Sequence, residues 1–203
     1  IEIDNYKLRY DQVFLWQSHY FIWKQMIEKN ILKLLILEDT CLFIDNFNQE
    51  YTELLEKHKD LKFDILYLGY SGAELDYNKP LYLINKGIPR LTHSYILTLS
   101  GAQKLVKQLN TINFPFDEVM GRMFNRKELI GYRTSQLLTY QEYQKKDKRY
   151  QQYLNNSYNK VHLVEKDKNI SFLIQEKMSL DNNLYDILIS INVHENIDFL
   201  KEQ

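Results

Sequence analysis

Apolar residues follow two different spacings along the first 140 residues. Residues 11–29 place large apolar side chains at intervals of four, three and four, which predicts an amphipathic helix; these side chains are Trp16, Tyr20, Trp23 and Ile27. Residues 32–37 are expected to form a strand, because residues 34–37 are a short unbroken apolar run, which is typical of a strand buried on both faces in the centre of a parallel sheet. A second amphipathic helix is expected over residues 47–59.

The same alternation of strands and helices continues to about residue 110. Residues 63–69 predict a strand that stops at a glycine, and residues 70–90 predict a long loop with a short strand at 81–84. Residues 94–99 are apolar and rich in β-formers, and Ser100-Gly101-Ala102-Gln103 then matches a capping box at the start of a helix. Strands that alternate with helices predict an α/β fold in which helices pack on a central sheet.

The character of the chain changes after Tyr140, so we expect two parts, residues 1–140 and 141–203. Residues 141–160 are rich in Gln, Lys, Tyr and Asn, which is typical of a solvated helix or a mobile segment. Apolar runs return in the last forty residues, which could form an appended strand and helix or an element that mediates oligomerisation.

Composition narrows the possible functions. The 203 residues are 44% apolar and carry a formal net charge of -1, so the chain can form a core but lacks the basic excess of a nucleic-acid-binding protein. No apolar run reaches the roughly 20 residues of a membrane span. Cys41 is the only cysteine, which excludes an intramolecular disulfide and leaves the compartment unidentified.

Two adjacent carboxylates, Glu38 and Asp39, directly follow the buried apolar run. An unpaired charge is too costly to bury, so the pair is expected where the strand leaves the core. Ligands bind at the carboxyl ends of strands in open α/β sheets, and carboxylates suit Mg²⁺ or Mn²⁺ shared with phosphates. The alternative is a strand that simply ends in solvated charges.

Five segments, in this order and spacing, resemble glycosyltransferase family 25, and most closely its collagen-modifying branch. They are SHYFIWKQMIEKN (18–30), LLILEDT (34–40), FDILYLG (63–69), SYILTLSGAQKLV (94–106) and FPFDEVMGRMF (114–124). The resemblance covers about residues 12–140. The strand with an Arg-containing segment that normally opens the family's domain is not found, so the first strand or part of the donor pocket is expected to be missing.

The resemblance implies a GT-A-like, Rossmann-like sandwich with a mixed, mostly parallel central sheet flanked by helices. It also implies a UDP-sugar donor and Mn²⁺ (or Mg²⁺), which would neutralise the diphosphate as it leaves. Asp39 is the first expected metal ligand, and Glu38 either joins it or orients the donor near the ribose. Thr40 stands where the family has a further aspartate, which puts metal affinity in doubt.

The family transfers sugar with inversion, which requires a base on the acceptor hydroxyl. Asp117 matches the family's Pro-x-Asp position and is the expected base, with Glu118 as the second candidate. The alternative for Asp117 is an ordinary helix N-cap.

Four further residues are expected to bind the donor. Tyr67 and Gly69 end the second strand, where a glycine permits close approach of a ligand, or simply makes a turn. Ser100 and Gly101 begin a helix whose N–H groups could face an anion, although capping alone would explain the serine.

Other side chains have weaker signals. His19 and His93 are expected to be structural, with a supporting role near the donor as the alternative, and Gln141 or Glu142 could replace a late metal-binding histidine.

The expected function is therefore transfer of a galactose- or glucose-type sugar from a UDP-sugar to an acceptor hydroxyl. The resemblance suggests hydroxylysine of a collagen-like protein or a glycan as the acceptor. The alternatives are an inactive nucleotide-sugar or glycan-binding module and an interaction scaffold assembled through residues 141–203.

Overall fold

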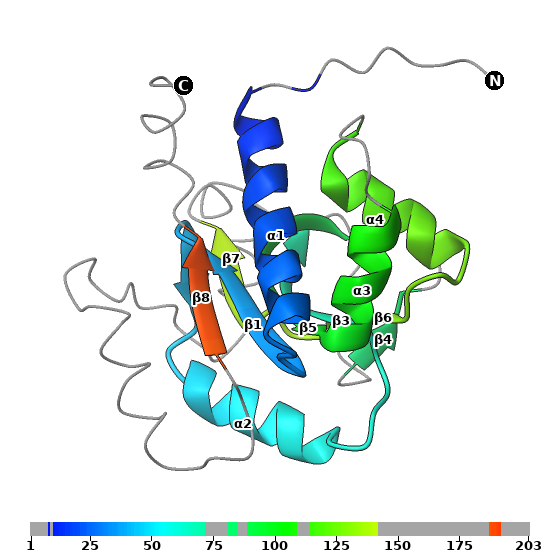
Figure 1. Cartoon of the computed structure of the whole chain (residues 1–203). Coiled ribbons are helices and arrows are strands. Elements are labelled where there is room, and N and C mark those ends of the chain that lie inside the picture. The colour runs from blue at the N-terminus through cyan, green and yellow to red at the C-terminus, as the bar shows by residue number, and fades with distance from the viewer. Residues whose placement is uncertain are drawn as a thin grey trace.

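The computed structural model describes residues 8, 10–71, 81–84, 89–108, 114–141 and 187–191 of the chain (Figure 1). These ranges contain, in order, α1 (Tyr10–Glu28), β1 (Lys33–Glu38), β2 (Cys41–Phe43), α2 (Phe47–Lys57), β3 (Ile65–Ser71), β4 (Leu81–Leu83), β5 (Arg90–Thr98), α3 (Leu99–Gln108), α4 (Phe116–Asn125), β6 (Gly131–Thr134), β7 (Thr139–Gln141) and β8 (Ile187–Ile191). The helices and strands predicted up to residue 108 are thereby confirmed to within a few residues. No described helix is long and apolar enough to cross a membrane.

A six-stranded mixed sheet forms the centre of the molecule, in the order β4-β6-β3-β5-β1-β8. The expected α/β class, with helices flanking a Rossmann-like mixed sheet, is confirmed. Strands β1, β3, β6 and β8 share one direction, whereas β4 and β5 oppose it. Only two of the five neighbouring pairs are therefore parallel, so the expectation of a mostly parallel sheet is wrong. β1 also does not lie between two parallel neighbours, although its apolar run suggested this. β5 separates β1 from β3 and is antiparallel to both.

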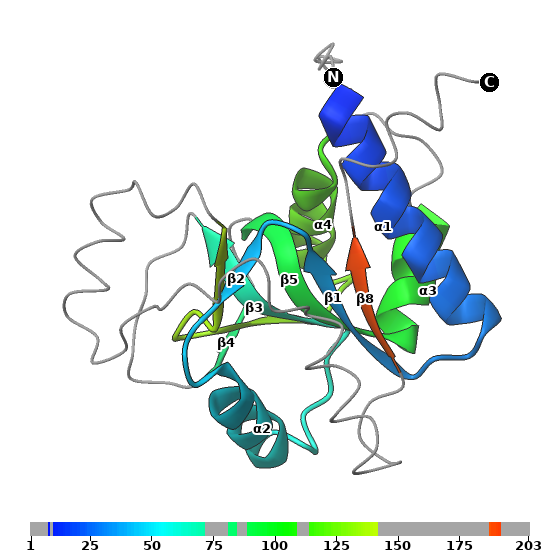
Figure 2. The same ribbon diagram turned by 90° about the vertical axis from the view of Figure 1, so that its left-hand side faces the viewer.

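Three helices pack together against the sheet and the fourth lies apart. Figures 1 and 2 show α1 beside α3, with α4 next to α3, while α2 lies away from these helices near the lower end of the sheet. The apolar stripe of α1 supplies Trp16, Trp23 and Met26 to the core, where none is more than 2% exposed. These side chains pack with β1, β3 and β5, whose central residues are almost all buried.

Two later segments return to the first part of the chain. β7 pairs with β2, so that Gln141 lies opposite Cys41. β8 comes from the range 141–203 and pairs with β1 in parallel, with Ile191 opposite Glu38. The described part of the C-terminal range thus extends the main sheet, and the division of the chain at residue 140 stays a prediction.

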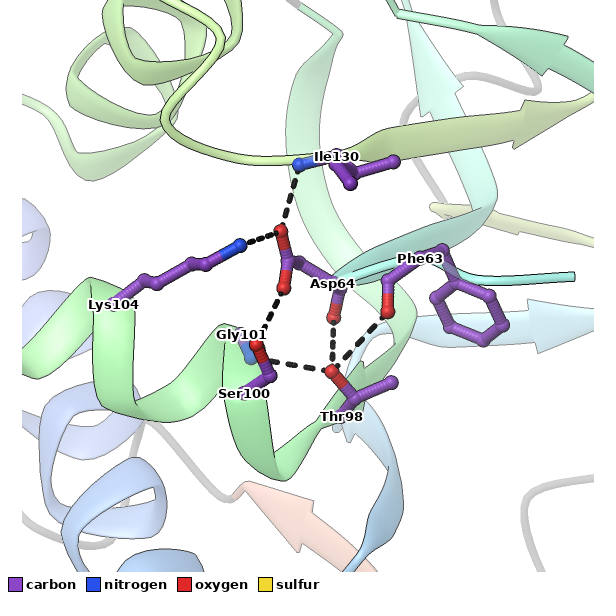
Figure 3. A network of polar contacts seen from close by, with 7 residues as sticks. All are labelled: Phe63, Asp64, Thr98, Ser100, Gly101, Lys104 and Ile130. Carbon is purple, nitrogen blue, oxygen red and sulfur yellow. Dashed lines mark hydrogen bonds and ion pairs between the residues drawn. The ribbon is translucent and has the colours of Figure 1, made fainter.

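The start of α3 differs from the predicted capping box. Thr98 precedes the helix, and its hydroxyl accepts a hydrogen bond from the Gly101 N–H at 3.1 Å, which is the usual role of an N-cap side chain. Ser100 lies two residues too late for that role. It donates instead to the Asp64 carboxylate at 3.0 Å, as Figure 3 shows.

Asp64 joins three elements at this end of the sheet (Figure 3). Its carboxylate also accepts from Lys104 of α3 at 2.6 Å and from the Ile130 N–H, just before β6, at 2.8 Å. Gly101 allows the close approach, because a Cβ there would lie 2.5 Å from the Asp64 carbonyl oxygen. This buried carboxylate therefore holds α3 and β6 to the start of β3.

Candidate active site

Glu38 ends β1 as a buried carboxylate, 6% exposed, with three hydrogen-bond partners. Its Oε1 atom accepts from the Thr92 hydroxyl at 2.9 Å and lies 3.4 Å from the His19 Nε2 atom. Its Oε2 atom accepts from the Gln141 side-chain amide at 3.0 Å. A carboxylate offers about four lone-pair positions, so Glu38 keeps roughly one for a ligand.

These partners favour the ionised form of Glu38. Burial alone would raise its pKa, but the hydrogen bond and attraction of His19 and the hydrogen bond of Thr92, together with His93, hold the pKa below its ordinary value. The side chain is therefore a fixed negative charge at neutral pH, at the carboxyl end of the strand.

A β-bulge brings Thr92 to this carboxylate. Gly69 of β3 pairs with Ser94 and Ser71 pairs with Arg90, so β5 advances four residues where β3 advances two. Within the extra residues Leu91 has a φ of 76°, a left-handed conformation that costs energy for a non-glycine residue. Bulges of this kind redirect side chains and are frequent beside active sites.

Asp39 and Thr40 follow Glu38 in an exposed turn between β1 and β2. Asp39 is thus available to a ligand, as expected for a metal-binding carboxylate. Within the described ranges, however, no three His, Cys, Asp or Glu side chains are grouped to hold a metal ion. The protein ligands fit only a cation that also takes oxygens from a bound diphosphate, as Mg²⁺ commonly does.

A compact group of small polar residues surrounds Gly69, near the end of β3. A Cβ at this position would lie 2.2 Å from the His93 Nε2 atom and 2.3 Å from the Thr139 Oγ1 atom. The glycine is therefore required because β5 and the start of β7 approach its backbone, which leaves its expected role in binding donor a prediction.

Burial controls the two titratable groups nearest to this glycine. His93 is fully buried, and burial lowers its pKa to about 4 despite the opposing effects of Glu38 and the Thr139 backbone. Cys41 is buried, and burial raises the pKa of its thiol to about 12, so the thiolate form that acts as a nucleophile is not favoured.

Asp117 lies in the first turn of α4, directly after Phe116. The N-cap position belongs to Pro115, so the N-cap alternative for Asp117 is wrong; its Oδ1 atom accepts instead from the Glu118 N–H at 2.9 Å. Burial, offset in part by the nearby N–H and by Arg90, raises the Asp117 pKa. A raised pKa makes a carboxylate a stronger base. Glu118 is more exposed and lies 3.9 Å from Arg122.

Tyr67 lies in the buried part of β3. It pairs with Tyr95 across β3 and β5, and both residues are fully buried. No described residue hydrogen-bonds to the Tyr67 hydroxyl. Its pKa is raised well above the ordinary value, first by burial and then by the charge of Asp117.

Ser100 and Gly101 lie elsewhere. Because β5 runs opposite to β1, Thr98 pairs with Lys33 at the start of β1, roughly 17 Å of strand away from Glu38. Both residues serve the Asp64 network of Figure 3. The structure therefore does not bring them to the edge that carries the other candidates, and their expected role with the donor loses its geometric basis.

The structure adds residues to this edge that the sequence did not single out as site residues. Thr92 and Tyr95 belong to β5, and no local pattern marks either of them. His19 was expected to be structural and Gln141 was proposed only as a metal ligand, yet both contact Glu38. One sequence signal could have pointed to His19: it lies four residues before Trp23, so both side chains fall on one face of α1.

Taken together, the fold and this edge define an α/β protein with two adjacent carboxylates at the end of β1. Comparison with known sequences agrees with the resemblance to one family. The sequence model described as glycosyltransferase family 25 (LPS biosynthesis protein) matches residues 16–86.

Three relatives illustrate the similarity. A glycosyltransferase 25 family member of Drosophila melanogaster is 29% identical, with 62% of this chain aligned to 24% of the relative. A probable inactive glycosyltransferase 25 family member 3 of Rattus norvegicus is 31% identical over 54% of this chain and 20% of the relative. Human procollagen galactosyltransferase 2 is 26% identical over 57% of this chain and 20% of the relative.

The resemblance to glycosyltransferase family 25 is thereby confirmed. The matched part of the chain spans only about a quarter or less of the length of these relatives.

Proposed function

We propose that this chain forms the nucleotide-sugar-binding part of a glycosyltransferase of the family 25 type. The observation that carries the proposal is the pairing of a fixed, ionised Glu38 with an exposed Asp39 at the end of β1, on a chain similar to these transferases. The donor is a UDP-sugar of the galactose or glucose type. The acceptor is a hydroxyl group, of hydroxylysine in a collagen-like protein or of a glycan.

The two carboxylates at the strand end have different roles in this proposal. Asp39, with its exposed side chain, would hold Mn²⁺ or Mg²⁺ together with the diphosphate, and the cation would supply charge neutralisation on the leaving group. Glu38 already has three partners and would use its remaining lone pair as an acceptor for a ribose hydroxyl. Metal ligation by Glu38 is the less favoured of its two expected roles.

Asp117 acts as the base in the proposed reaction. Its carboxylate removes the proton of the acceptor hydroxyl, whose oxygen attacks the anomeric carbon on the face opposite the departing UDP, with inversion. Partial burial of Asp117 and its raised pKa suit this role better than the exposed, Arg122-facing Glu118.

Turnover tests this proposal. UDP release should be measured with Mn²⁺ and a panel of UDP-sugars, with a hydroxylysine-containing peptide or a glycan as acceptor. Asp39→Ala and Asp117→Asn should each lower the rate by about a hundredfold or more, because each removes a group that acts in the transition state. Equal background release by the original chain and both variants would refute the transferase.

A second candidate function is a nucleotide-sugar or glycan-binding module without turnover. Thr40 favours it, because a hydroxyl replaces a carboxylate beside Asp39, and relatives named as inactive are among those that match. Titration calorimetry with UDP, combined with the UDP-release assay, separates the two functions. A module would bind UDP in the calorimeter but would release no UDP from any UDP-sugar. Thr40→Asp should strengthen Mn²⁺-dependent UDP binding, whereas the uncharged Thr40→Asn should not.

A further inference from the structure

Two α1 side chains, His19 and Trp23, contact the elements around the candidate carboxylates, and His19 contacts both β1 and α4. His19 and Trp23 are fully buried and lie one turn apart on the same face of the helix. Hydrogen bonds connect them to Tyr95 of β5 and to Glu38 of β1, and aromatic contacts connect them to Phe116 of α4. We call His19, Trp23, Tyr95 and Phe116 the α1 cluster.

The hydrogen bonds of the α1 cluster determine the tautomer of His19. An indole N–H can only donate, so the Trp23 N–H, 3.0 Å from the Tyr95 oxygen, gives its proton to that oxygen. The Tyr95 hydroxyl is then free to donate to the His19 Nδ1 atom, 2.6 Å away. The Nδ1 atom of His19 then accepts from Tyr95, and its Nε2–H donates to the Glu38 carboxylate, which can only accept.

Aromatic packing connects the same group to the candidate base. The centroids of the His19 and Phe116 rings are 4.6 Å apart, and Trp23 meets Phe116 edge-on at 6.0 Å. Phe116 is buried and immediately precedes Asp117 at the start of α4. The position of the Asp117 backbone is therefore fixed by contacts with α1.

We propose that His19 is a positioning residue that fixes Glu38 and Asp117 relative to one another. It orients the Glu38 carboxylate through its Nε2–H and holds the start of α4 through its ring. The donor and the acceptor are thereby presented to each other in a constant geometry. This inference rests on the proposed function, because it assigns the two carboxylates to donor binding and to acceptor deprotonation.

The first test is independent of turnover. Long-range ¹H–¹⁵N spectra of the full chain at neutral pH report which ring nitrogen of each histidine carries the proton, and the His19→Gln variant identifies the His19 signals. We expect His19 in the Nε2–H form, and we expect Tyr95→Phe to alter that form. A His19 protonated on Nδ1 in the original chain would overturn the proposal.

The second test uses one substitution for each of the two contacts of His19, the hydrogen bonds towards Glu38 and the ring packing against the start of α4. Tyr95→Phe removes only the hydroxyl that orients His19 and should raise the donor KM by about five- to tenfold, the usual effect of losing one buried hydrogen bond. Phe116→Leu loosens the packing under Asp117 and should lower kcat by about tenfold or more with a smaller change in KM.

The matched control is Thr98→Val, which removes a hydroxyl from the opposite end of β5. It destabilises the start of α3 without touching the α1 cluster, and it should leave both kinetic constants unchanged. If Tyr95→Phe and Phe116→Leu change only thermal stability, as the control does, the α1 cluster has no positioning role. An original chain without UDP release or binding refutes the proposed function instead, while the histidine spectra still test the hydrogen-bond arrangement.

Discussion

At the scale of single residues, Glu38 shows how a buried charge becomes a site. An isolated carboxylate would take up a proton in this environment, but donors from α1, β5 and β7 stabilise its ionised form. The adjacent Asp39 lies instead in an exposed turn. Neighbouring residues of the same charge thus have different environments, which allows one to orient a ligand and the other to bind a cation.

His93 gives a prediction for the pH dependence of stability. Its pKa of about 4 in the folded chain is below the ordinary 6.5, so the unfolded chain binds more protons between these values and the free energy of unfolding rises with pH. Acidification from pH 7 to 4 should therefore cost up to about 3 kcal/mol from this residue. Urea unfolding at a series of pH values measures the effect.

The control for this measurement is His93→Gln, which cannot titrate. Glu38 contributes in the same direction, because its lowered pKa also loses stability as the pH falls, so the variant should show a weaker dependence rather than none. An unchanged slope between pH 4 and 6.5 in the variant would show that His93 does not contribute.

At the scale of secondary-structure elements, the sequence predicts some features and misses others for physical reasons. The α1 stripe and the apolar runs of β1 and β3 follow from local periodicity, so their positions could be predicted. The position of Ser100 could not, because it depends on the direction of β5, and a short apolar run does not reveal whether a strand is parallel or antiparallel.

The contacts of Glu38 with Thr92 and Gln141 are of the same unpredictable kind. Thr92 reaches the carboxylate through a bulge, and Gln141 reaches it because β7 pairs with β2. Both contacts join residues more than 50 positions apart, and neither has a local sequence signature. Asp117 could be proposed from a motif, whereas its connection to α1 through Phe116 required the tertiary structure.

The packing of β3 against β5 and β7 gives a second prediction. Gly69→Ala would place a Cβ 2.6 Å from the Thr139 carbonyl oxygen, a backbone atom that cannot rotate away. We expect a loss of about 3 kcal/mol in the free energy of unfolding, the upper range for overpacking, and a fall of roughly 10 °C in Tm.

The control in the same strand is Ser71→Ala, which adds no atoms and should change Tm by no more than a surface substitution does. Calorimetric melting of both variants provides the comparison. A Gly69→Ala protein that melts with the original chain would show that β5 and β7 do not approach the Gly69 backbone as closely as described.

At the scale of the whole molecule, β5 lies between β1 and β3 and runs antiparallel to both. The two ends of the sheet's strands therefore carry different groups of polar side chains. One end holds Asp64, Ser100 and Lys104 in a network that ties α3 and β6 to the sheet (Figure 3). The opposite end gathers Glu38 and Asp39 and lies near Asp117. Structural and candidate catalytic carboxylates are thus separated along the strands, and the account assigns ligand binding only to the second end.

Binding of UDP tests this central claim most directly. Titration calorimetry of the chain with UDP in the presence of Mn²⁺ should give a measurable affinity that Asp39→Ala weakens by at least about tenfold, since it removes a charged ligand of the cation. Asp60→Ala, an exposed carboxylate after α2, should bind UDP as the original chain does. Equal affinities for the original chain and Asp39→Ala, or no binding at all, would contradict a nucleotide-sugar site at the end of β1.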